Sequence, residues 1–190
     1  LRNSSAASDV YKRQGIRFDA SLESLSGLKT LSDDGVLTAG SSSQICDGAA
    51  AIMIVNDAGL EKLGLKPRAK IVSLALAGDD PVIMLTGPIP ASKTVLEKAE
   101  LSIEDMDLYE VNEAFAPVPL AWAHELKADK EKLNVNGGAM ALGHPLGGTG
   151  AKLMTTLLHE LERREGKYGL QAICEGGGTA NALIIERLKY

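Results

Sequence analysis

The sequence predicts an α/β protein with a mixed sheet, because short apolar runs that suit strands alternate along the chain with stretches that suit helices. Composition agrees with this fold class. Of the 190 residues, 45% are hydrophobic but only 4% are aromatic, and 20 are glycine. Such a mixture favours an aliphatic α/β core over an aromatic-rich β-sandwich. The length suffices for one well-buried domain or for one and a half small ones.

Six apolar runs are predicted to form strands. The first two are expected to be buried, because apolar residues dominate both of them. The third should deliver Asn112 to its carboxyl end, and the fourth precedes a glycine-rich loop. The six expected strands cover residues 49–55, 70–77, 108–111, 133–136, 170–174 and 182–188.

Helices are predicted between these strands. One begins at Pro90, because proline is favoured in a first helical turn. The last is the clearest, since Leu153, Leu157 and Leu161 recur on one face. The expected helices cover residues 57–63, 90–99, a stretch that ends near 126, and 152–164. Shorter signals are a weakly amphipathic patch at 21–31, a turn at 33–35 and a capping box at 102–105.

Charge and cysteine usage argue against several classes of protein. The formal net charge is −5 and the basic residues are scattered, so no nucleic-acid surface is expected. No apolar run approaches the roughly 20 residues that a membrane span needs. Cys46 and Cys174 lie far apart and outside zinc-ligand spacings, and no metal site is expected with three histidines. Free thiols fit a reducing compartment, so a cytoplasmic location is expected.

His144 has an unusual setting for a lone histidine, which is more often a structural residue. It stands between a glycine and a proline, and the run 147–150 leads into a predicted helix N-terminus. An imidazole near that positive end should disfavour its protonated form. A neutral imidazole can act as a base or as an oxyanion donor. His124 and His159 lack this setting and are expected to be solvated on helices.

The same loop partly matches a phosphate-binding loop. Its glycine spacing from Gly143 to Gly148 fits, but Thr149 stands where such a loop requires lysine. Lys152 lies too far into the helix to replace that lysine. No predicted strand is followed by the dinucleotide-binding glycine pattern either. A nucleotide-binding function is therefore a weak alternative.

Cys174 ends a predicted strand and precedes Glu175 and three glycines. An isolated cysteine is by default a small buried hydrophobe. Three glycines in succession, however, let a ligand approach the backbone and leave N–H groups for a developing oxyanion. Cys46 lacks that setting and is expected to be structural.

Asn112, in the sequence Asn-Glu-Ala-Phe, can donate to an oxygen or to a water and is neutral at every pH.

In this order, the motifs around Asn112, His144 and Cys174 resemble those of the C-terminal half of thiolases, a family of CoA-dependent acyltransferases. The likeness extends from about residue 15 to the C-terminus. Three further segments also look thiolase-like, at 38–44, 47–51 and 86–91. One departure is Ser41, which stands where the family commonly has asparagine. The nucleophilic cysteine of a thiolase first half is not present in this sequence.

The resemblance implies a role for each site residue. His144 would deprotonate the nucleophilic cysteine and help to hold the thioester oxygen, and Asn112 would position a water in the same oxyanion hole. Cys174 would move the proton on the α-carbon of acetyl-CoA or protonate the leaving enolate, and the Gly176 amide would serve a second oxyanion hole. The residues expected to touch the CoA pantetheine or to line the acyl pocket are Ser43, Met84, Ala114 and Phe115.

The resemblance also implies the thiolase α/β fold, in which two similar halves stack helices and mixed sheets in layers. The expected domains are a non-native or disordered leader at 1–14, the end of the thiolase loop region at 15–35, the last strand and helix of the N-terminal half at 36–66, and the C-terminal domain at 67–190.

The activity implied for the intact protein is thiolytic cleavage of a 3-ketoacyl-CoA and the reverse Claisen condensation of acetyl-CoA. CoA and acyl-CoA would be substrates, with no tightly bound cofactor, and the protein would be a homodimer or homotetramer. A thiolase of fatty-acid β-oxidation or a related degradative route is slightly favoured over a dedicated acetoacetyl-CoA enzyme. Without the nucleophile the chain by itself should be inactive. The alternative is a non-catalytic CoA- or lipid-binding module on a thiolase scaffold.

Overall fold

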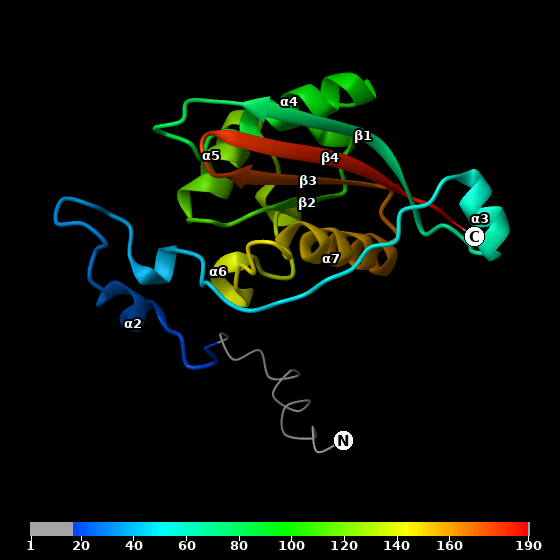
Figure 1. Ribbon diagram of the computed structural model, residues 1–190. Coiled ribbons are helices and arrows are strands. Elements are labelled where there is room, and N and C mark those ends of the chain that lie inside the picture. The colour runs from blue at the N-terminus through cyan, green and yellow to red at the C-terminus, as the bar shows by residue number, and fades with distance from the viewer. Residues whose placement is uncertain (1–16, 190) are drawn as a thin grey trace, which may run out of the picture.

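The computed structural model describes residues 17–189, and its centre is a single mixed sheet with the strand order β1-β4-β3-β2 (Figure 1). Strands β1 and β3 run antiparallel to β4, whereas β2 pairs in parallel with β3. The strands are β1 (Ala69–Gly78), β2 (Leu108–Val111), β3 (Tyr168–Glu175) and β4 (Thr179–Arg187). Four of the six predicted strands, and the mixed character of the sheet, are therefore confirmed.

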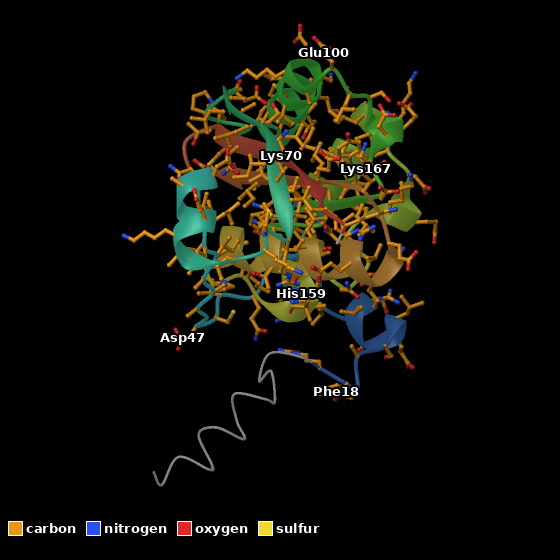
Figure 2. The ribbon with its side chains drawn as sticks, turned by 90° about the vertical axis from the view of Figure 1, so that its right-hand side faces the viewer. Phe18, Asp47, Lys70, Glu100, His159 and Lys167 are labelled. Atoms are coloured by element: carbon orange, nitrogen blue, oxygen red, sulfur yellow. The ribbon has the colours of Figure 1, made fainter. Side chains whose placement is uncertain are left out.

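Helices cover the two faces of the sheet, so the domain has three layers. Helices α4 (Pro88–Ala99) and α5 (Pro117–Leu126) pack on one face, and α7 (Thr149–Arg164) packs on the other. Figure 2 views the domain from the side, with Glu100 after α4 above the sheet and His159 of α7 below it. Residues that alternate along β2 divide between the two cores: Tyr109 packs with α4 and α5, and Leu108 with α7.

Local sequence signals account for most of the helix boundaries. Helix α3 (Asp57–Leu63) begins after Asn56, whose side chain accepts a hydrogen bond from the Gly59 N–H, and it ends at Gly64 in the left-handed conformation. The helix that was expected from Pro90 starts one half-turn earlier, at Pro88, and α7 starts at Thr149 rather than at residue 152.

The remaining elements are short. Residues 21–31, expected to be weakly amphipathic, contain a single helix of five residues, and the capping box expected at 102–105 is present. These elements are α2 (Leu22–Ser26), η1 (Ala39–Ser41), η2 (Ile103–Asp105), η3 (Lys130–Lys132) and α6 (Ala139–Leu142).

Two predicted strands are wrong. Residues 49–55 form no strand, and Met53 and Ile54 are 71% and 73% exposed, because no described segment pairs with them. Residues 133–136 make a single parallel bridge, between Leu133 and Tyr109. The chain then turns at Asn134, whose φ of 48° is left-handed, and the Asn134 amide replaces a partner strand by bonding both the N–H and the carbonyl of Val111.

The expectation that β1 is fully buried is also wrong. β1 lies at the edge of the sheet, and Leu76 on it is 76% exposed, although Ala75 is buried. An apolar run can equally belong to a covered strand or to an edge strand, and its composition does not distinguish them.

Two further expectations concern the leader and a membrane span. The expected leader at 1–14 lies outside the described residues. Within residues 17–189, no helix is both long enough and apolar enough to cross a membrane.

Produced by itself, the 190-residue chain should self-associate, because edge strand β1 presents unpaired backbone groups together with exposed Ile71, Leu74 and Leu76. Light scattering over a range of concentrations measures this. The pair of substitutions Leu74→Lys and Leu76→Lys should reduce association, whereas Leu120→Lys, at an exposed position of α5, should not. A monodisperse monomer at high concentration would contradict the prediction.

Candidate active site

The candidate site lies at the carboxyl ends of the parallel strands β2 and β3. Asn112 follows β2 directly, and its backbone N–H donates to the carbonyl of Ala172 on β3 at 3.0 Å. Cys174 lies two residues further along β3. Parallel strands end at the same edge of a sheet, so the pairing of Val111 with Ala172 brings the Asn112 and Cys174 side chains together.

Asn112 connects His144 to Cys174. Its Nδ2 lies 3.4 Å from His144 Nε2, and its side chain lies beside the Cys174 thiol, where it acts to lower the pKa of that thiol. Both Asn112 and Cys174 are buried. The Asn112 Oδ1 is buried as well and accepts no hydrogen bond from the protein atoms of the described residues. The three residues singled out from separate motifs thus form one cluster around a neutral amide.

Thr149, the first residue of α7, orients the His144 ring. Its hydroxyl lies 2.6 Å from His144 Nδ1 and also donates to the carbonyl of Pro145 at 2.9 Å. Since the hydroxyl proton is directed at Pro145, the hydroxyl oxygen accepts from Nδ1–H. We therefore assign the proton of the neutral ring to Nδ1, which leaves Nε2 with a lone pair facing Asn112.

Burial shifts the two titratable groups of this cluster in opposite directions. The pKa of His144 is lowered, first by burial and second by the positive charge of Lys152. The pKa of the Cys174 thiol is raised, mainly by burial, with a smaller contribution of the same sign from Glu175. Both groups are therefore uncharged near neutral pH. The direction for His144 agrees with the expectation, and burial and the charge of Lys152 cause it.

Residues 41–46 join the Asn112 segment to the His144 segment. Ser43 N–H donates to the Ala114 carbonyl at 2.9 Å, and Ser42 forms an antiparallel bridge with Phe115. A few residues on, the His144 N–H donates to the Gln44 carbonyl at 2.8 Å. These bonds place Ser43 beside the Ala114–Phe115 segment.

The glycines after Cys174 form the tight turn between β3 and β4. Gly177 and Gly178 have φ of 80° and 81°, which glycine adopts without strain. A Cβ at Gly178 would come within 3 Å of the 79–81 backbone, so the loop that holds Met84 packs directly on this turn. Gly176, in contrast, is exposed, and a Cβ there would meet no neighbour within 4 Å. Its backbone is open to an approaching ligand.

Several residues that hold the site together were not identified from the sequence. In the sequence, Thr149 was considered only as evidence against a phosphate-binding loop. A hydroxyl at a helix start, five positions after a histidine, could have indicated a residue that orients the imidazole. Glu113 and Lys152 contact the loop that leads to His144 and gave no such signal. The two histidines expected to be solvated, His124 and His159, are exposed.

Cys46, expected to be structural, is a half-buried free thiol that packs against Gly143. Among residues 17–189, no group of three or more potential ligands is arranged to hold a metal ion.

Comparison with known protein families decides the assignment. Residues 65–187 match the model of the thiolase C-terminal domain, and residues 2–58 match that of the thiolase N-terminal domain. The chain belongs to the thiolase family. The family resemblance drawn from the motifs is thereby confirmed.

Relatives within the thiolase family support the same assignment. The chain is 57% identical to the steroid 3-ketoacyl-CoA thiolase FadA6 of Mycobacterium tuberculosis over 90% of its own length and 42% of that protein. It is 48% identical to an acetyl-CoA acetyltransferase of Cupriavidus necator, over 94% of the chain and 45% of the relative. The chain thus spans somewhat less than half the length of these relatives.

A solved structure confirms the thiolase fold. Human mitochondrial 3-ketoacyl-CoA thiolase superposes with a TM-score of 0.86 at 44% identity, over 92% of this chain and 45% of the human chain. The same human enzyme has also been solved in complex with CoA, again with a TM-score of 0.86.

In the intact thiolase that carries this chain, Thr149→Val should lower kcat by about 10–100-fold. The variant removes the acceptor for His144 Nδ1–H, and a hydrogen bond to a charged group contributes about 1.5–3 kcal/mol as the imidazolium forms. Steady-state kinetics measure the effect. Thr149→Ser should retain most activity, and Thr155→Val is the matched control, because the Thr155 hydroxyl bonds only a carbonyl of its own helix. Equal activity of Thr149→Val and Thr155→Val would contradict this role.

Proposed function

We propose that the intact protein containing this chain is an acyl-CoA C-acyltransferase that cleaves a 3-ketoacyl-CoA with CoA and runs the reverse condensation of acetyl-CoA. The observation that carries this proposal is the cluster in which the Asn112 amide contacts both His144 and Cys174. A base, a neutral hydrogen-bond donor and a protonated thiol are the tools that carbonyl chemistry on a thioester requires. A non-catalytic binding module has no need of all three, which disfavours that alternative.

His144 acts as the base for the nucleophile. Its Nε2 lone pair accepts the thiol proton of the nucleophilic cysteine before that cysteine is acylated; the family resemblance places this cysteine in the N-terminal half, of which this chain holds little. As the ring becomes charged, Thr149 accepts from Nδ1–H and stabilises the imidazolium. Asn112 Nδ2 can donate to the thioester oxygen or to a water that does so, because the amide is fixed at the end of β2.

Cys174 serves the second substrate. In the cleavage direction, the bond between the α- and β-carbons of the 3-ketoacyl group breaks, and the departing acetyl-CoA enolate takes the thiol proton. The resulting thiolate then accepts the proton of the incoming CoA thiol, which attacks the acyl-enzyme and restores the neutral cysteine. A raised pKa suits this role, since the group must hold its proton until the enolate forms. The Gly176 amide, which is exposed two residues after Cys174, would stabilise the enolate oxygen.

CoA binding is assigned to Ser43, Met84, Ala114 and Phe115. Support comes from their position, since Ser43 is bonded to Ala114 and the Met84 loop packs on the turn after Cys174. The human mitochondrial relative solved in complex with CoA gives this ligand class further support. We propose CoA and acyl-CoA as substrates with no tightly bound cofactor, a degradative role in fatty-acid β-oxidation or a related route in the cytoplasm, and a homodimer or homotetramer.

In the intact enzyme, Cys174→Ala should still be acylated by acyl-CoA but should not complete condensation or thiolysis, while His144→Ala should impair both half-reactions. Proton transfers of this kind contribute about 10²–10⁴-fold in rate. The measurement compares the burst of CoA release from acyl-CoA with steady-state turnover. Cys46→Ala, which removes a thiol that only packs on Gly143, should cost little. Normal turnover of Cys174→Ala together with a defective Cys46→Ala would show that the two thiols are wrongly assigned.

The acylation half-reaction should gain rate with rising pH through the pKa of His144, because the neutral ring is the base. Burial and Lys152 lower that pKa, so the acid limb should lie below the usual histidine value of about 6.5. The test is the pH dependence of burst amplitude and rate. An acid limb above the usual histidine value would mean that His144 is stabilised in its charged form, contrary to the geometry.

A further inference from the structure

The segment 137–143, which leads to His144, has little regular structure of its own. It contains the four-residue helix α6, and Gly137 and Gly143 at its two ends have φ of 81° and 85°. Its own backbone hydrogen bonds, from Leu142 N–H to Gly138 and from Gly143 N–H to Ala139, close a single turn and do not tie the segment to neighbouring elements. Contacts from neighbouring side chains therefore help to determine its position.

Glu113 contacts the beginning of this segment. Its Oε2 accepts a hydrogen bond from the Met140 N–H at 3.0 Å, and its Oε1 accepts one from Asn134 Nδ2 at 3.0 Å. A Cβ placed on Gly138 would collide with the carboxylate. Gly138 has φ of −113°, which any residue adopts, so the need for glycine at this position arises from Glu113 rather than from the backbone.

Lys152 contacts the end of the same segment. From the first turn of α7 its Nζ donates to the Gly143 carbonyl at 2.7 Å, one residue before His144. The carboxylate of Glu113 and the ammonium of Lys152 therefore hold the two ends of one short segment, each through a charge-assisted hydrogen bond to the backbone.

We propose that Glu113 and Lys152 are positioning residues that hold opposite ends of the segment 137–143 and thereby set where His144 lies. Neither residue touches the reacting groups, and the kinetic part of this inference rests on the proposed thiolase activity. The effects of the two residues on His144 can be measured separately, because they act by different means. Lys152 carries a positive charge close to the imidazole, whereas Glu113 acts through hydrogen bonds alone.

The charges around His144 support this difference. Burial and Lys152 lower the pKa of His144. Two thiols also lie in this part of the chain: Cys174, beside Asn112, and Cys46, which packs on Gly143. Beneath the segment, burial raises the pKa of Glu110 to about 8, with Glu113 adding to the rise. Glu110 is therefore largely neutral at pH 7 and does not add a second carboxylate charge beside Glu113. Glu160 of α7 pairs with Arg163 and Arg164.

The first test measures the pKa of His144 by NMR in the intact protein labelled on histidine, with the His144 signal identified by its loss in His144→Ala. Lys152→Gln should raise that pKa and move the acid limb of the burst to higher pH, because a positive charge that disfavours the imidazolium is removed. Lys152→Arg should leave the pKa low. The control Lys93→Gln removes an exposed charge from α4 on the opposite face of the sheet and should change nothing. An unchanged His144 pKa in Lys152→Gln would overturn the role of Lys152.

The second test concerns Glu113. In Glu113→Gln two N–H donors face an amide with one acceptor oxygen, so one hydrogen bond is lost and the segment shifts. A displacement of about 1 Å at a reacting group costs about 10²-fold in rate, so kcat should fall by about that factor with KM little changed. The Met140 amide should also exchange its hydrogen faster than in the control Glu125→Gln, an exposed residue of α5. Gly138→Ala, which forces a methyl group against the carboxylate, should reproduce both effects.

A failure of the positioning roles of Glu113 and Lys152 can be distinguished from a failure of the proposed acyltransferase activity. If the intact protein shows no acyl transfer, the pKa of His144 and the exchange of the Met140 amide still report on the two contacts. Unchanged Met140 exchange in Glu113→Gln, or a kcat equal to that of Glu125→Gln in an active enzyme, would overturn the role of Glu113.

Discussion

The parallel pairing of β2 with β3 is the constraint on which the rest of the site depends. It is the one parallel pair among the four described strands, and its register sets Val111 beside Ala172. Because both strands then end at the same edge, Asn112 and Cys174 meet there without any contribution from a loop. His144 contacts Asn112, and residues 41–46 hydrogen-bond to the segments that hold Asn112 and His144.

Beyond that edge, the site is built largely from segments without regular structure that are held by side chain to backbone hydrogen bonds. Asn134 takes the place of a strand beside Val111, Glu113 holds Met140, and Lys152 holds Gly143. A neutral hydrogen bond of this kind contributes about 0.5–1.5 kcal/mol and one to a charged group about 1.5–3 kcal/mol. Several such bonds in one short stretch can fix a loop that buries little apolar surface.

The sequence predicted the layered α/β architecture well where a signal is local. The apolar runs of β2, β3 and β4 and the leucine face of α7 are patterns that lie within a few neighbouring residues. Residues 49–55 and 133–136 failed for a different reason, because an apolar run becomes a strand only if another segment pairs with it. The same limit applies to the site. Asn112, His144 and Cys174 stand in recognisable motifs, whereas the contacts of Glu113 and Lys152 join positions 27 and 9 residues apart that no local pattern connects.

The opposite pKa shifts of His144 and Cys174 explain how one partly buried cluster can hold a base and an acid close together. Burial disfavours the charged form of each, which lowers the histidine pKa and raises the thiol pKa. An imidazolium–thiolate pair is therefore disfavoured, and the neutral amide of Asn112 between the two supplies no charge to stabilise it. Nucleophilic cysteines need the contrary, a pKa lowered by a cation or a helix N-terminus. The environment of Cys174 thus suits a residue that carries a proton to and from carbon, and it argues against Cys174 being the cysteine that becomes acylated.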